Sequence, residues 1–445
     1  MITEIYNLSP VWVQNLMCSI KGWFIQRRRF GKSFHIELQR YNQGYYNQEK
    51  ELVRFLNNIK HLPAYAQYLN NIDITPDNIY DILFRLPIID KNYVKAHMSD
   101  FINTKCTERL FEMRTSGTTG SGLIFPYTIN MENRQWAIWW RYRLHLGITM
   151  GTWCGWFGGK NIVSFHQKGK PYWRINRPGK QIMFSSYHLN KDTVMDYLDE
   201  IANKKLVWLH GYPSHIARLA HLTSQSNTEC TAVQYCKSVK YITFGAENLY
   251  PTQIDIIQKV FPNAKLRQHY GLNEGVANIS QDINGNWVTD DDFAFIEFIP
   301  KDKDNPNVCK IIGTGFSNNA FALVRYDTGD LANVEWTANG KAKVISIDGR
   351  SSNVVKLPNG IELCEASLSI FLHDYPNIME AQFHQQSIDK IILLIVRGCN
   401  YSEIDENRIK ECLPELFNGA EVFIKYVDEI PRTSAGKFKI VKSDI

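Results

Sequence analysis

The chain has 445 residues, of which 44% are hydrophobic, so it is long enough for two or more domains with buried cores. Charged residues make up 21% and the formal net charge is only +5, which excludes the concentrated basic surface typical of nucleic-acid-binding proteins. Nine scattered cysteines without a Cys-x-x-Cys pair predict a protein of the reducing cytoplasm. We expect no cysteine-bound metal; the alternative is a structural zinc site that includes Cys230 and Cys236.

The N-terminal segment has two features of interest. The first twenty residues carry Glu4 and no long apolar run, so neither a secretory signal nor a membrane span is expected. Between residues 21 and 32, three arginines are interleaved with Trp23, Phe24 and Phe30. The favoured interpretation is a helix that buries these aromatic side chains and leaves its arginines in solvent. Peripheral contact with an anionic membrane surface is the alternative.

The next part of the chain has helical spacing. Apolar residues recur at intervals of three and four between residues 49 and 100, so residues 1–110 are expected to form a helical lead-in. Between residues 121 and 331, short β-rich runs alternate with helical patterns, which predicts parallel sheets in an α/β domain. Examples are the strand-like runs 206–209 and 239–244 and the helical run 251–260.

Three later strand-like runs follow one another without helices and predict an antiparallel stretch, over residues 293–298, 308–312 and 321–325. After Gly349 the pattern restarts as a compact α+β unit. Helices are expected over 365–372 and 403–416, and strands over 381–383, 391–397 and 422–427. We therefore predict an α/β fold in which residues 1–349 form a large N-terminal domain of parallel and mixed sheets with helices. Residues 350–445 would form a small, mobile C-terminal α+β domain.

The segment from Thr115 to Gly122 reads Thr-Ser-Gly-Thr-Thr-Gly-Ser-Gly and follows the strand-like run 110–114. Glycines let backbone amides approach a ligand, and hydroxyl groups can donate hydrogen bonds to phosphate oxygens. No Gly-Lys-Ser/Thr follows, which disfavours a P-loop kinase or GTPase. Because a cluster of this composition is by itself more often a surface loop, the prediction of a phosphate-binding loop depends on the motifs that follow it.

Five further motifs follow in a fixed order, namely Gly245-Ala246-Glu247, Tyr270-Gly271-Leu272-Asn273-Glu274, Tyr326-Asp327-Thr328-Gly329-Asp330, Asp348-Gly349-Arg350 and Pro431-Arg432-Thr433-Ser434-Ala435-Gly436-Lys437. Over residues 110 to 440 this set resembles the acyl-adenylate-forming superfamily of acyl-coenzyme A ligases, luciferases and peptide-synthetase adenylation domains. The segments 61–65, 86–91 and 211–214 resemble its phenylacetate-coenzyme A ligase family, in particular the capsular-polysaccharide-associated branch.

The resemblance implies a role for each matching residue. Ser116, Thr118 and Thr119 would bind the β- and γ-phosphates of ATP. Gly245, Ala246 and Glu247 would border the adenine, with Tyr270 stacked on it, and Asp330, aided by Arg350, would accept hydrogen bonds from the ribose. The full implied set of cofactor-binding residues is Thr115, Ser116, Gly117, Thr118, Thr119, Gly120, Gly245, Ala246, Glu247, Tyr270, Gly271, Asn273, Asp330 and Arg350.

Two catalytic residues are implied in the same way. Glu274 would help to hold the Mg²⁺ ion that neutralises the triphosphate and the leaving pyrophosphate. Lys437 would bridge the substrate carboxylate and the α-phosphate, because a cation between two anions lowers the barrier to their reaction. Asn273 departs from the family pattern, since most relatives carry threonine there. Ser351 and Ser352 also depart from it, since relatives commonly have an Asp or Lys hinge at that point.

The implied reaction is ATP-dependent activation of a small carboxylic acid as acyl-AMP, followed by acyl transfer to coenzyme A. Two alternatives stay open, namely transfer to an amine in surface-polysaccharide synthesis and a non-catalytic nucleotide or carboxylate binder. Related ligases are often dimers, so a homodimer also stays open. Candidate walls of the acyl pocket, with ordinary core as the competing interpretation, are Trp136, Trp139, Trp140, Tyr212, Phe244 and His269.

Overall fold

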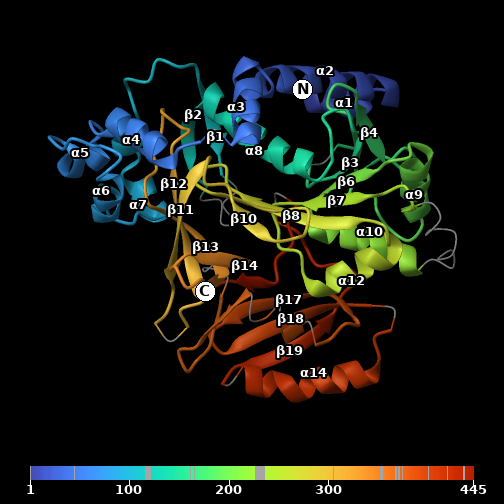
Figure 1. The fold of residues 1–445 in the computed structure, drawn as a ribbon. Coiled ribbons are helices and arrows are strands. Elements are labelled where there is room, and N and C mark those ends of the chain that lie inside the picture. Colours follow the sequence, from blue (N-terminus) through green and yellow to red (C-terminus); the bar gives the residue numbers. More distant parts are fainter. Residues whose placement is uncertain are drawn as a thin grey trace. The chain divides into compact units, whose positions relative to one another are not determined.

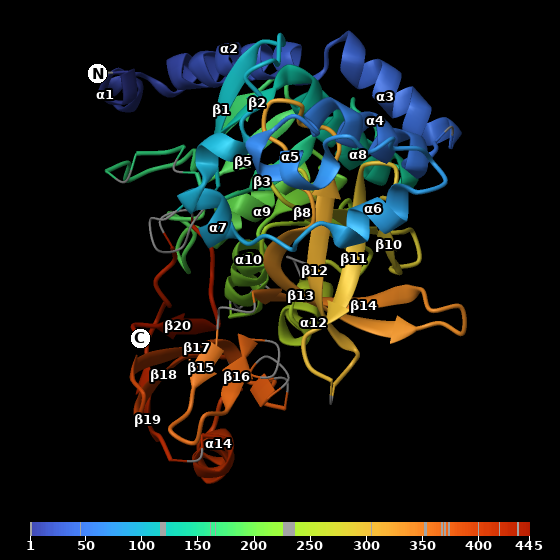
Figure 2. The same cartoon turned by 90° about the vertical axis from the view of Figure 1, so that its left-hand side faces the viewer.

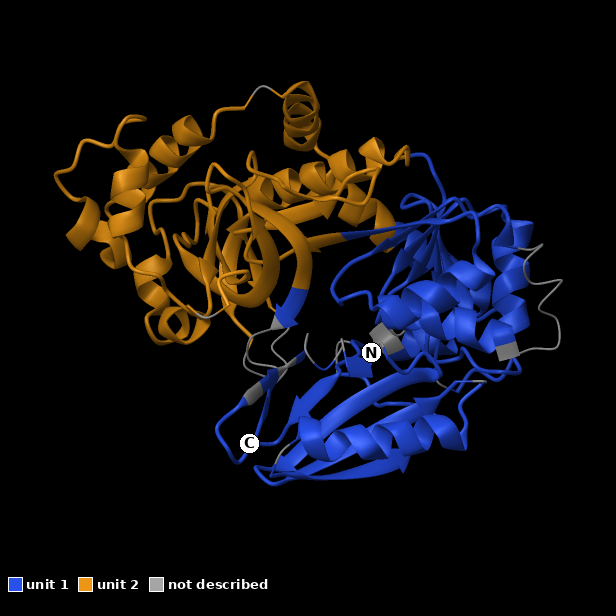
Figure 3. Ribbon diagram, turned by 60° about the horizontal axis from the view of Figure 1, so that its bottom comes forward, with its two compact units in different colours: residues 1–20, 151–268, 348–445 blue, residues 21–150, 269–347 orange. Residues whose placement is uncertain are grey.

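The structure is a computed structural model that describes residues 2–44, 46–115, 122–160, 162–164, 166–225, 236–303, 305–350, 354–365, 368, 371–372, 374–398, 400–417, 419–433 and 436–445. The chain forms two compact units (Figure 3). Unit 1 comprises residues 1–20, 151–268 and 348–445, and unit 2 comprises residues 21–150 and 269–347.

The central sheet of unit 1 follows the strand order β8-β7-β6-β3-β5-β4. Its strands are β3 (Cys154–Phe157), β4 (Trp173–Asn176), β5 (Gln181–Phe184), β6 (Trp208–Gly211), β7 (Tyr241–Phe244) and β8 (Lys265–Gly271). All neighbours pair in parallel except β4 with β5. The parallel arrangement brings the carboxyl ends of β3, β6 and β7 to one edge, where the loops of an α/β sheet usually bind ligands.

Three helices of unit 1 pack on this sheet, namely α9 (Val194–Asn203), α10 (Pro213–Gln225) and α12 (Pro251–Val260). Figure 1 shows α10 and α12 side by side beneath β6 and β7. Their apolar sides pack on the buried residues of the strands. For example, Ile216 and Ile257 share a hydrophobic core with Leu209 and Ile242. The sheet is therefore held by burial of its apolar face, which is the main favourable term in folding.

Residues 354–445 of unit 1 form a second sheet with the order β19-β18-β17-β20. The elements are β15 (Val354–Lys356), β16 (Glu362–Cys364), β17 (Ile378–Ser387), β18 (Lys390–Arg397), α14 (Glu403–Leu416), β19 (Glu421–Tyr426) and β20 (Val441–Ser443). Helix α14 lies along one face of this sheet (Figure 1). Its Ile409 and Leu413 join Phe383, Leu393 and Phe417 in a separate hydrophobic core.

The chain begins with α1 (Ile2–Leu8) and α2 (Val11–Arg29). Helix α1 and residues 11–20 of α2 belong to unit 1, and the rest of α2 belongs to unit 2. The other helices of unit 2 are α3 (Lys32–Gln43), α4 (Gln48–Ile59), α5 (Pro63–Leu69), α6 (Ile79–Arg85), α7 (Lys91–Ala96), the 3-10 helix η1 (Met98–Phe101) and α8 (Ile129–His145). Helices α4 to α7 gather beside β11 and β12 (Figure 2). They share a core that includes Phe55, Tyr65 and Leu83.

The strands of unit 2 are β1 (Leu110–Arg114), β2 (Ile124–Thr128), β9 (Asn278–Gln281), β10 (Trp287–Thr289), β11 (Ala294–Pro300), β12 (Val308–Gly315), β13 (Tyr326–Trp336) and β14 (Ala342–Arg350). Strands β11 to β14 form one sheet in chain order, and β1 pairs with β2 as an antiparallel hairpin. The last residues of β8 pair antiparallel with β9.

The predicted α/β fold class, the helical lead-in and the α+β character of residues 354–445 are confirmed. Helices α12 and α14 have the predicted bounds, and the pairing of β11 with β12 is antiparallel as expected. The strand predicted over 321–325 is wrong. Phe321 makes only an isolated bridge to Ile102, and Arg325 has a positive φ of 51° that turns the chain before β13. The apolar run is there because it is buried in the core of unit 2.

The favoured interpretation of residues 21–32 is also wrong in part. Phe30 does pack on Phe34, with ring centroids 4.7 Å apart. However, Trp23 is 46% exposed and Phe24 is 62% exposed. Arg28 and Arg29 do not point freely into solvent, because both bind the buried carboxylate of Glu132 at 2.7 and 3.0 Å.

In the part of the chain that the structure describes, no helix combines the length and the apolar character needed to cross a membrane.

The close packing at the edge of the central sheet can be tested at Gly211. A Cβ atom at this position would lie 2.2 Å from the carbonyl oxygen of Phe157, and that oxygen accepts the hydrogen bond of the Tyr212 amide at 3.0 Å. We expect Gly211→Ala to lower the free energy of unfolding by about 1–3 kcal/mol, the usual effect of overpacking. Denaturant unfolding measures it. Gly169→Ala is the control, because nothing lies within 4 Å of a Cβ there, and equal losses in both variants would contradict the explanation.

Candidate functional site

The predicted catalytic lysine follows a tight turn near the C-terminus. The hydroxyl of Thr433 accepts a hydrogen bond from the Lys437 amide at 3.0 Å, and its carbonyl accepts one from the Gly436 amide at 2.8 Å. The Thr433 amide in turn donates to the Lys437 carbonyl at 2.9 Å. Gly436 has a φ of 76°, which favours glycine. Thr433 and Gly436 therefore fix the backbone from which the lysine projects.

The lysine turn, defined here as Thr433, Gly436 and Lys437, contacts the loop after β3 through Gly436. A Cβ atom on Gly436 would lie 2.6 Å from the Cα and 3.1 Å from the carbonyl oxygen of Gly159. Glycine is thus required at position 436 for two reasons, its positive φ and the close backbone approach. The contact brings the lysine turn to the edge of the sheet at which β3 ends.

Glu247 connects the lysine turn to the same edge. Its Oε1 accepts a hydrogen bond from the Phe438 amide at 2.6 Å, and its Oε2 accepts one from the Ser214 amide at 3.2 Å. Ser214 lies in the first turn of α10, where backbone amides lack helical partners and favour a negative charge. Burial raises the pKa of Glu247, and these donors oppose that shift. Ala246 precedes it with a φ of 71°, a strained conformation for a non-glycine residue.

Three further side chains hold the segment around the lysine turn. Arg432 donates to Glu380 at 2.6 Å, and both side chains are almost completely buried. Glu365 accepts hydrogen bonds from the Ile440 amide at 3.1 Å and from the Tyr250 hydroxyl at 3.4 Å. These contacts lie on both sides of residues 433–437, so the position of Lys437 is determined at several points.

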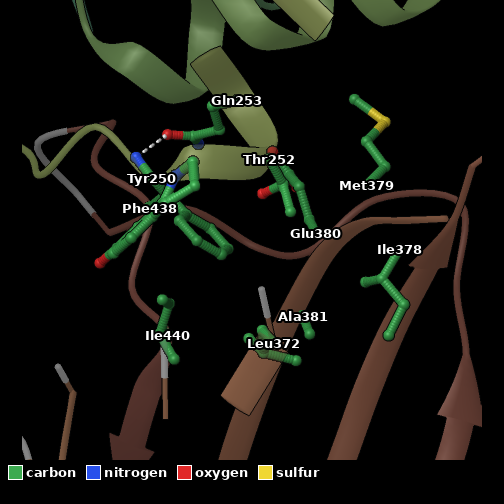
Figure 4. A pocket seen from close by; sticks show the side chains of 11 residues that line it. Tyr250, Thr252, Gln253, Leu372, Ile378, Met379, Glu380, Ala381, Phe438 and Ile440 are labelled. Carbon is green, nitrogen blue, oxygen red and sulfur yellow. Dashed lines mark hydrogen bonds between the residues drawn. The ribbon is translucent and has the colours of Figure 1, made fainter. Parts of the chain in front are cut away.

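A small pocket lies beside this segment (Figure 4). It is lined by side chains from α12 and β17 and by Phe438 and Ile440, which follow the lysine. The space open to a water molecule is about 30 Å³, too small for a carboxylic acid substrate. None of the predicted acyl-pocket residues lines it, so it is a gap beside the lysine turn and not the acyl pocket.

In unit 2, Tyr270 and Asp330 are brought together. The Tyr270 hydroxyl donates to Asp330 Oδ2 at 2.8 Å, and the Thr328 hydroxyl accepts a hydrogen bond from the Asp330 amide at 3.1 Å. Asp330 is buried. Burial and the Asp330 charge raise the pKa of Tyr270 well above its usual value, so the hydroxyl stays protonated and keeps donating. Two motifs that are 60 residues apart therefore form one polar cluster.

The flanks of the predicted phosphate loop are also in unit 2. Thr115 is buried and closes the base of the loop, because its amide donates to the Leu123 carbonyl and its hydroxyl accepts from the Leu123 amide, both at 2.9 Å. The Asn273 side chain donates to the Arg114 carbonyl at 3.4 Å. The motif that contains Asn273 and Glu274 therefore lies beside the end of β1, where the loop begins.

The predicted acyl-pocket residues belong to both units, and each unit is described by itself. Trp136, Trp139 and His269 form an aromatic cluster in unit 2, with centroids 5.0 Å apart for the two indoles and 5.7 Å for Trp139 and His269. Tyr212 is in unit 1, 5.2 Å from the ring of His215. Phe244 is fully buried in the core beneath the sheet, as the competing interpretation holds.

Several predicted residues lie outside the described part of the chain: Ser116, Gly117, Thr118, Thr119, Gly120, Ser351, Ser352 and Cys230. Arg350 ends β14, but its side chain also lies outside that part. Four residues around the lysine turn were not singled out from the sequence, namely Gly159, Glu365, Glu380 and Ser214 as a partner of Glu247. Of these four residues, only Ser214 lies in a motif noted in the sequence, the turn 211–214.

The chemistry of Glu274 suits Mg²⁺. Among the described residues, no group of three or more His, Cys, Asp or Glu side chains forms a metal cage. Mg²⁺ does not need one, because it commonly binds through one or two carboxylates, phosphate oxygens and waters. Glu274 is half-buried, and Asn273 beside it contacts the end of β1, where the predicted phosphate loop begins.

The chain is similar to several known proteins. Residues 358–444 match the family described as the CapK C-terminal domain. Protein CapK of Staphylococcus aureus is 29% identical, and the alignment covers 100% of both chains. A 2-hydroxyisobutyryl-CoA ligase in the postadenylation state has a TM-score of 0.63 at 14% identity, with 89% of each chain covered. The chain has the fold of the acyl-adenylate-forming superfamily.

An open conformation of the same ligase, in complex with 2-HIB-AMP and CoA, gives a TM-score of 0.51 at 14% identity, covering 89% of this chain and 90% of that one. The resemblance inferred from the ordered motifs, including that to the capsule-associated branch, is therefore confirmed. At such low identity the solved structures establish the fold, and the roles of single residues depend on the contacts described above.

The buried histidine beside the lysine turn gives a pH-dependent prediction. Burial lowers the pKa of His215 to about 4, and the neighbouring Arg432 charge adds to this shift. Burial also lowers the pKa of His221 to about 4. Because the unfolded histidines bind protons first, their stabilisation is present above about pH 6.5 and is lost as the pH falls towards 4.

We expect the free energy of unfolding of His215→Gln to decrease less than that of the native chain between pH 7 and pH 4. The difference should be roughly 3 kcal/mol, from the shift in one pKa. Chemical denaturation at several pH values measures this difference. His221→Gln is the comparison, because burial also lowers the pKa of His221 to about 4. If His215→Gln kept the full pH dependence, His215 would not be the buried neutral group that we describe.

Proposed function

We propose that this protein uses ATP to activate a carboxylic acid as its acyl-adenylate and releases pyrophosphate. In this reaction a carboxylate oxygen attacks the α-phosphorus, the bond from that phosphorus to the bridging oxygen breaks, and pyrophosphate leaves. No proton has to be removed from the nucleophile, so the protein's task is to position the reactants and to neutralise charge.

The observation that carries the proposal is the docking of the lysine turn at the carboxyl edge of the parallel sheet. Gly436 contacts Gly159 after β3, and Glu247 after β7 binds the Phe438 amide. A solvated lysine near a C-terminus needs no such support. The turn would place the Lys437 ammonium group where it can bridge the carboxylate and the α-phosphate, and this would offset their repulsion in the transition state.

The candidate nucleotide-binding residues belong to several motifs. Asp330, oriented by the Tyr270 hydroxyl, is the candidate acceptor for the ribose hydroxyl groups. Residues 115–120 are the candidate phosphate loop, whose base Thr115 closes. Glu274 is the candidate ligand for Mg²⁺, which when bound would neutralise the triphosphate and the leaving pyrophosphate. Gly245 to Glu247 would border the adenine, with the Glu247 carboxylate turned towards the Ser214 and Phe438 amides.

The acceptor of the acyl group is the second part of the proposal. We favour the thiol of coenzyme A, in line with the CoA ligases that share the fold. An amine acceptor is the second candidate, and similarity to a protein named CapK supports it through the capsular-polysaccharide-associated branch. We further propose residues 1–349 as the main domain and 350–445 as a lid domain, which would hinge at Ser351 and Ser352.

The lysine assignment can be tested by ATP–pyrophosphate exchange. With a panel of small and aromatic carboxylic acids, we expect exchange that depends on one acid or a few related ones. Lys437→Ala should lower the exchange rate by roughly 100-fold or more, because it removes a charge that acts in the transition state. Lys442→Ala, a neighbouring exposed lysine, should keep nearly the native rate. If Lys437→Ala bound ATP but exchanged at the native rate, the assignment would be wrong.

The lysine turn can be tested separately from the lysine. Glu247→Gln replaces one acceptor oxygen with an amide donor, so either the Phe438 or the Ser214 amide loses its partner. We expect about 1–3 kcal/mol less stability, from one unsatisfied buried donor, together with a lower kcat for exchange at an unchanged KM for ATP. A lower affinity for ATP with native kcat would instead support adenine contact as the main role of this carboxylate.

Product analysis separates the candidate functions. Incubation with ATP, the activating acid and coenzyme A should give the thioester and AMP. Accumulation of acyl-AMP with coenzyme A present, followed by its consumption on adding an amino sugar or amino acid, would favour the amine acceptor. Binding of ATP without exchange for any acid would support a non-catalytic binder and would overturn the proposal.

A further inference from the structure

Helix α2 packs on the protein with its polar side and not with its apolar side. The side chain of Gln14 accepts a hydrogen bond from the buried guanidinium of Arg174 at 2.5 Å. Asn15 accepts one from the Ile175 amide at 2.8 Å, and the Ser19 hydroxyl donates to the Ile175 carbonyl at 3.2 Å. A helix on the surface of a globular protein normally does the opposite and buries its apolar side.

The outward side of α1 and α2 is correspondingly apolar. Its residues recur at intervals of three and four, the spacing of one helix face. The exposed fractions are 56% for Ile5, 87% for Leu8, 69% for Trp12, 52% for Leu16, 50% for Ile20, 46% for Trp23 and 62% for Phe24. We call this set the apolar stripe. The stripe residues of α2 run from Trp12 to Phe24, so the stripe extends over about 18 Å of this helix.

The charges along α2 are all positive, and the one acidic residue beside the apolar stripe is Glu4 in the first turn of α1. No Asp or Glu occurs between Ile5 and Ile36, whereas this stretch contains five cationic residues, namely Lys21, Arg27, Arg28, Arg29 and Lys32. Arg28 and Arg29 are paired with Glu132. Arg27 is exposed and lies over the ring of Trp23, 5.3 Å from its centroid, and Lys21 is exposed beside it. The apolar stripe is thus flanked by uncompensated positive charge.

We propose that α1 and α2 form an interfacial anchor that places this protein on an anionic membrane surface. The apolar stripe would insert among the lipid headgroups and upper acyl chains, and Lys21 and Arg27 would lie at the level of the anionic headgroups. Tryptophan and phenylalanine favour this depth. The charge selects this occupant over a second copy of the chain, because two such cationic stripes facing each other would repel.

The anchor explains two other properties of the segment. Its buried polar contacts to Arg174 and Ile175 fix the rotation of α2, so that the apolar stripe faces away from the protein. In addition, no described helix has the length and apolar character to cross a bilayer, so contact would be restricted to one surface of the membrane. This inference is independent of the reaction that the protein catalyses.

Vesicle flotation with the full chain tests the anchor. We expect binding to vesicles that contain phosphatidylglycerol, about tenfold weaker binding to pure phosphatidylcholine, and loss of the difference in high salt. The triple variant Trp12→Ala, Trp23→Ala, Phe24→Ala should partition at least about tenfold less into anionic vesicles. The double variant Lys21→Glu, Arg27→Glu should lose the preference for anionic lipid.

The matched control is the double variant Ile404→Ala, Phe423→Ala, which removes exposed apolar side chains of residues 354–445, 72% and 48% exposed. It should bind vesicles like the native chain. Because all the substituted side chains are exposed, thermal unfolding should be nearly unchanged in every variant. The inference is overturned if the native chain does not bind anionic vesicles. It is also overturned if sedimentation velocity shows a native dimer that the triple variant dissociates while vesicle binding stays the same.

Discussion

The carboxylate of Glu247 is the interaction on which the arrangement of the lysine turn depends. It accepts hydrogen bonds from the first turn of α10 and from the amide that follows Lys437. One half-buried negative charge therefore links the ends of β6 and β7 to a segment nearly 200 residues later in the chain. Breaking either contact would leave a backbone donor without its partner, which costs more than the bond itself contributes.

The same principle applies to the other polar contacts of the site. Asp330 is held by the Tyr270 hydroxyl and by its own amide's bond to Thr328, so its carboxylate is presented in one orientation. Thr433 uses both its hydroxyl and its carbonyl to close the lysine turn. The residues proposed to bind the reactants are thus oriented by hydrogen bonds within the protein, as preorganised sites require.

Helix α2 packs on the protein differently from helices such as α10, α12 and α14. In α10, α12 and α14, buried apolar residues of the helix join a core. In α2 the polar side chains are used for packing, and the apolar ones are left at the surface. A face of this kind is stable only if something apolar covers it, or if its exposure is tolerated for the sake of binding.

The sequence by itself determined the fold class, most element bounds and the order of the motifs, because periodicity and glycine-rich turns are local properties. It determined neither the partners of Glu247 nor the contact of Gly436 with Gly159, since these join residues far apart in the chain. It was misleading for residues 321–325, where burial in a core and not strand pairing accounts for the apolar run. It also assigned Trp23 and Phe24 to the interior, because amphipathic spacing reveals that a helix has two faces but not which one meets the protein. Only the tertiary structure decides that, through the hydrogen bonds that Gln14 and Asn15 make to a strand about 160 residues away.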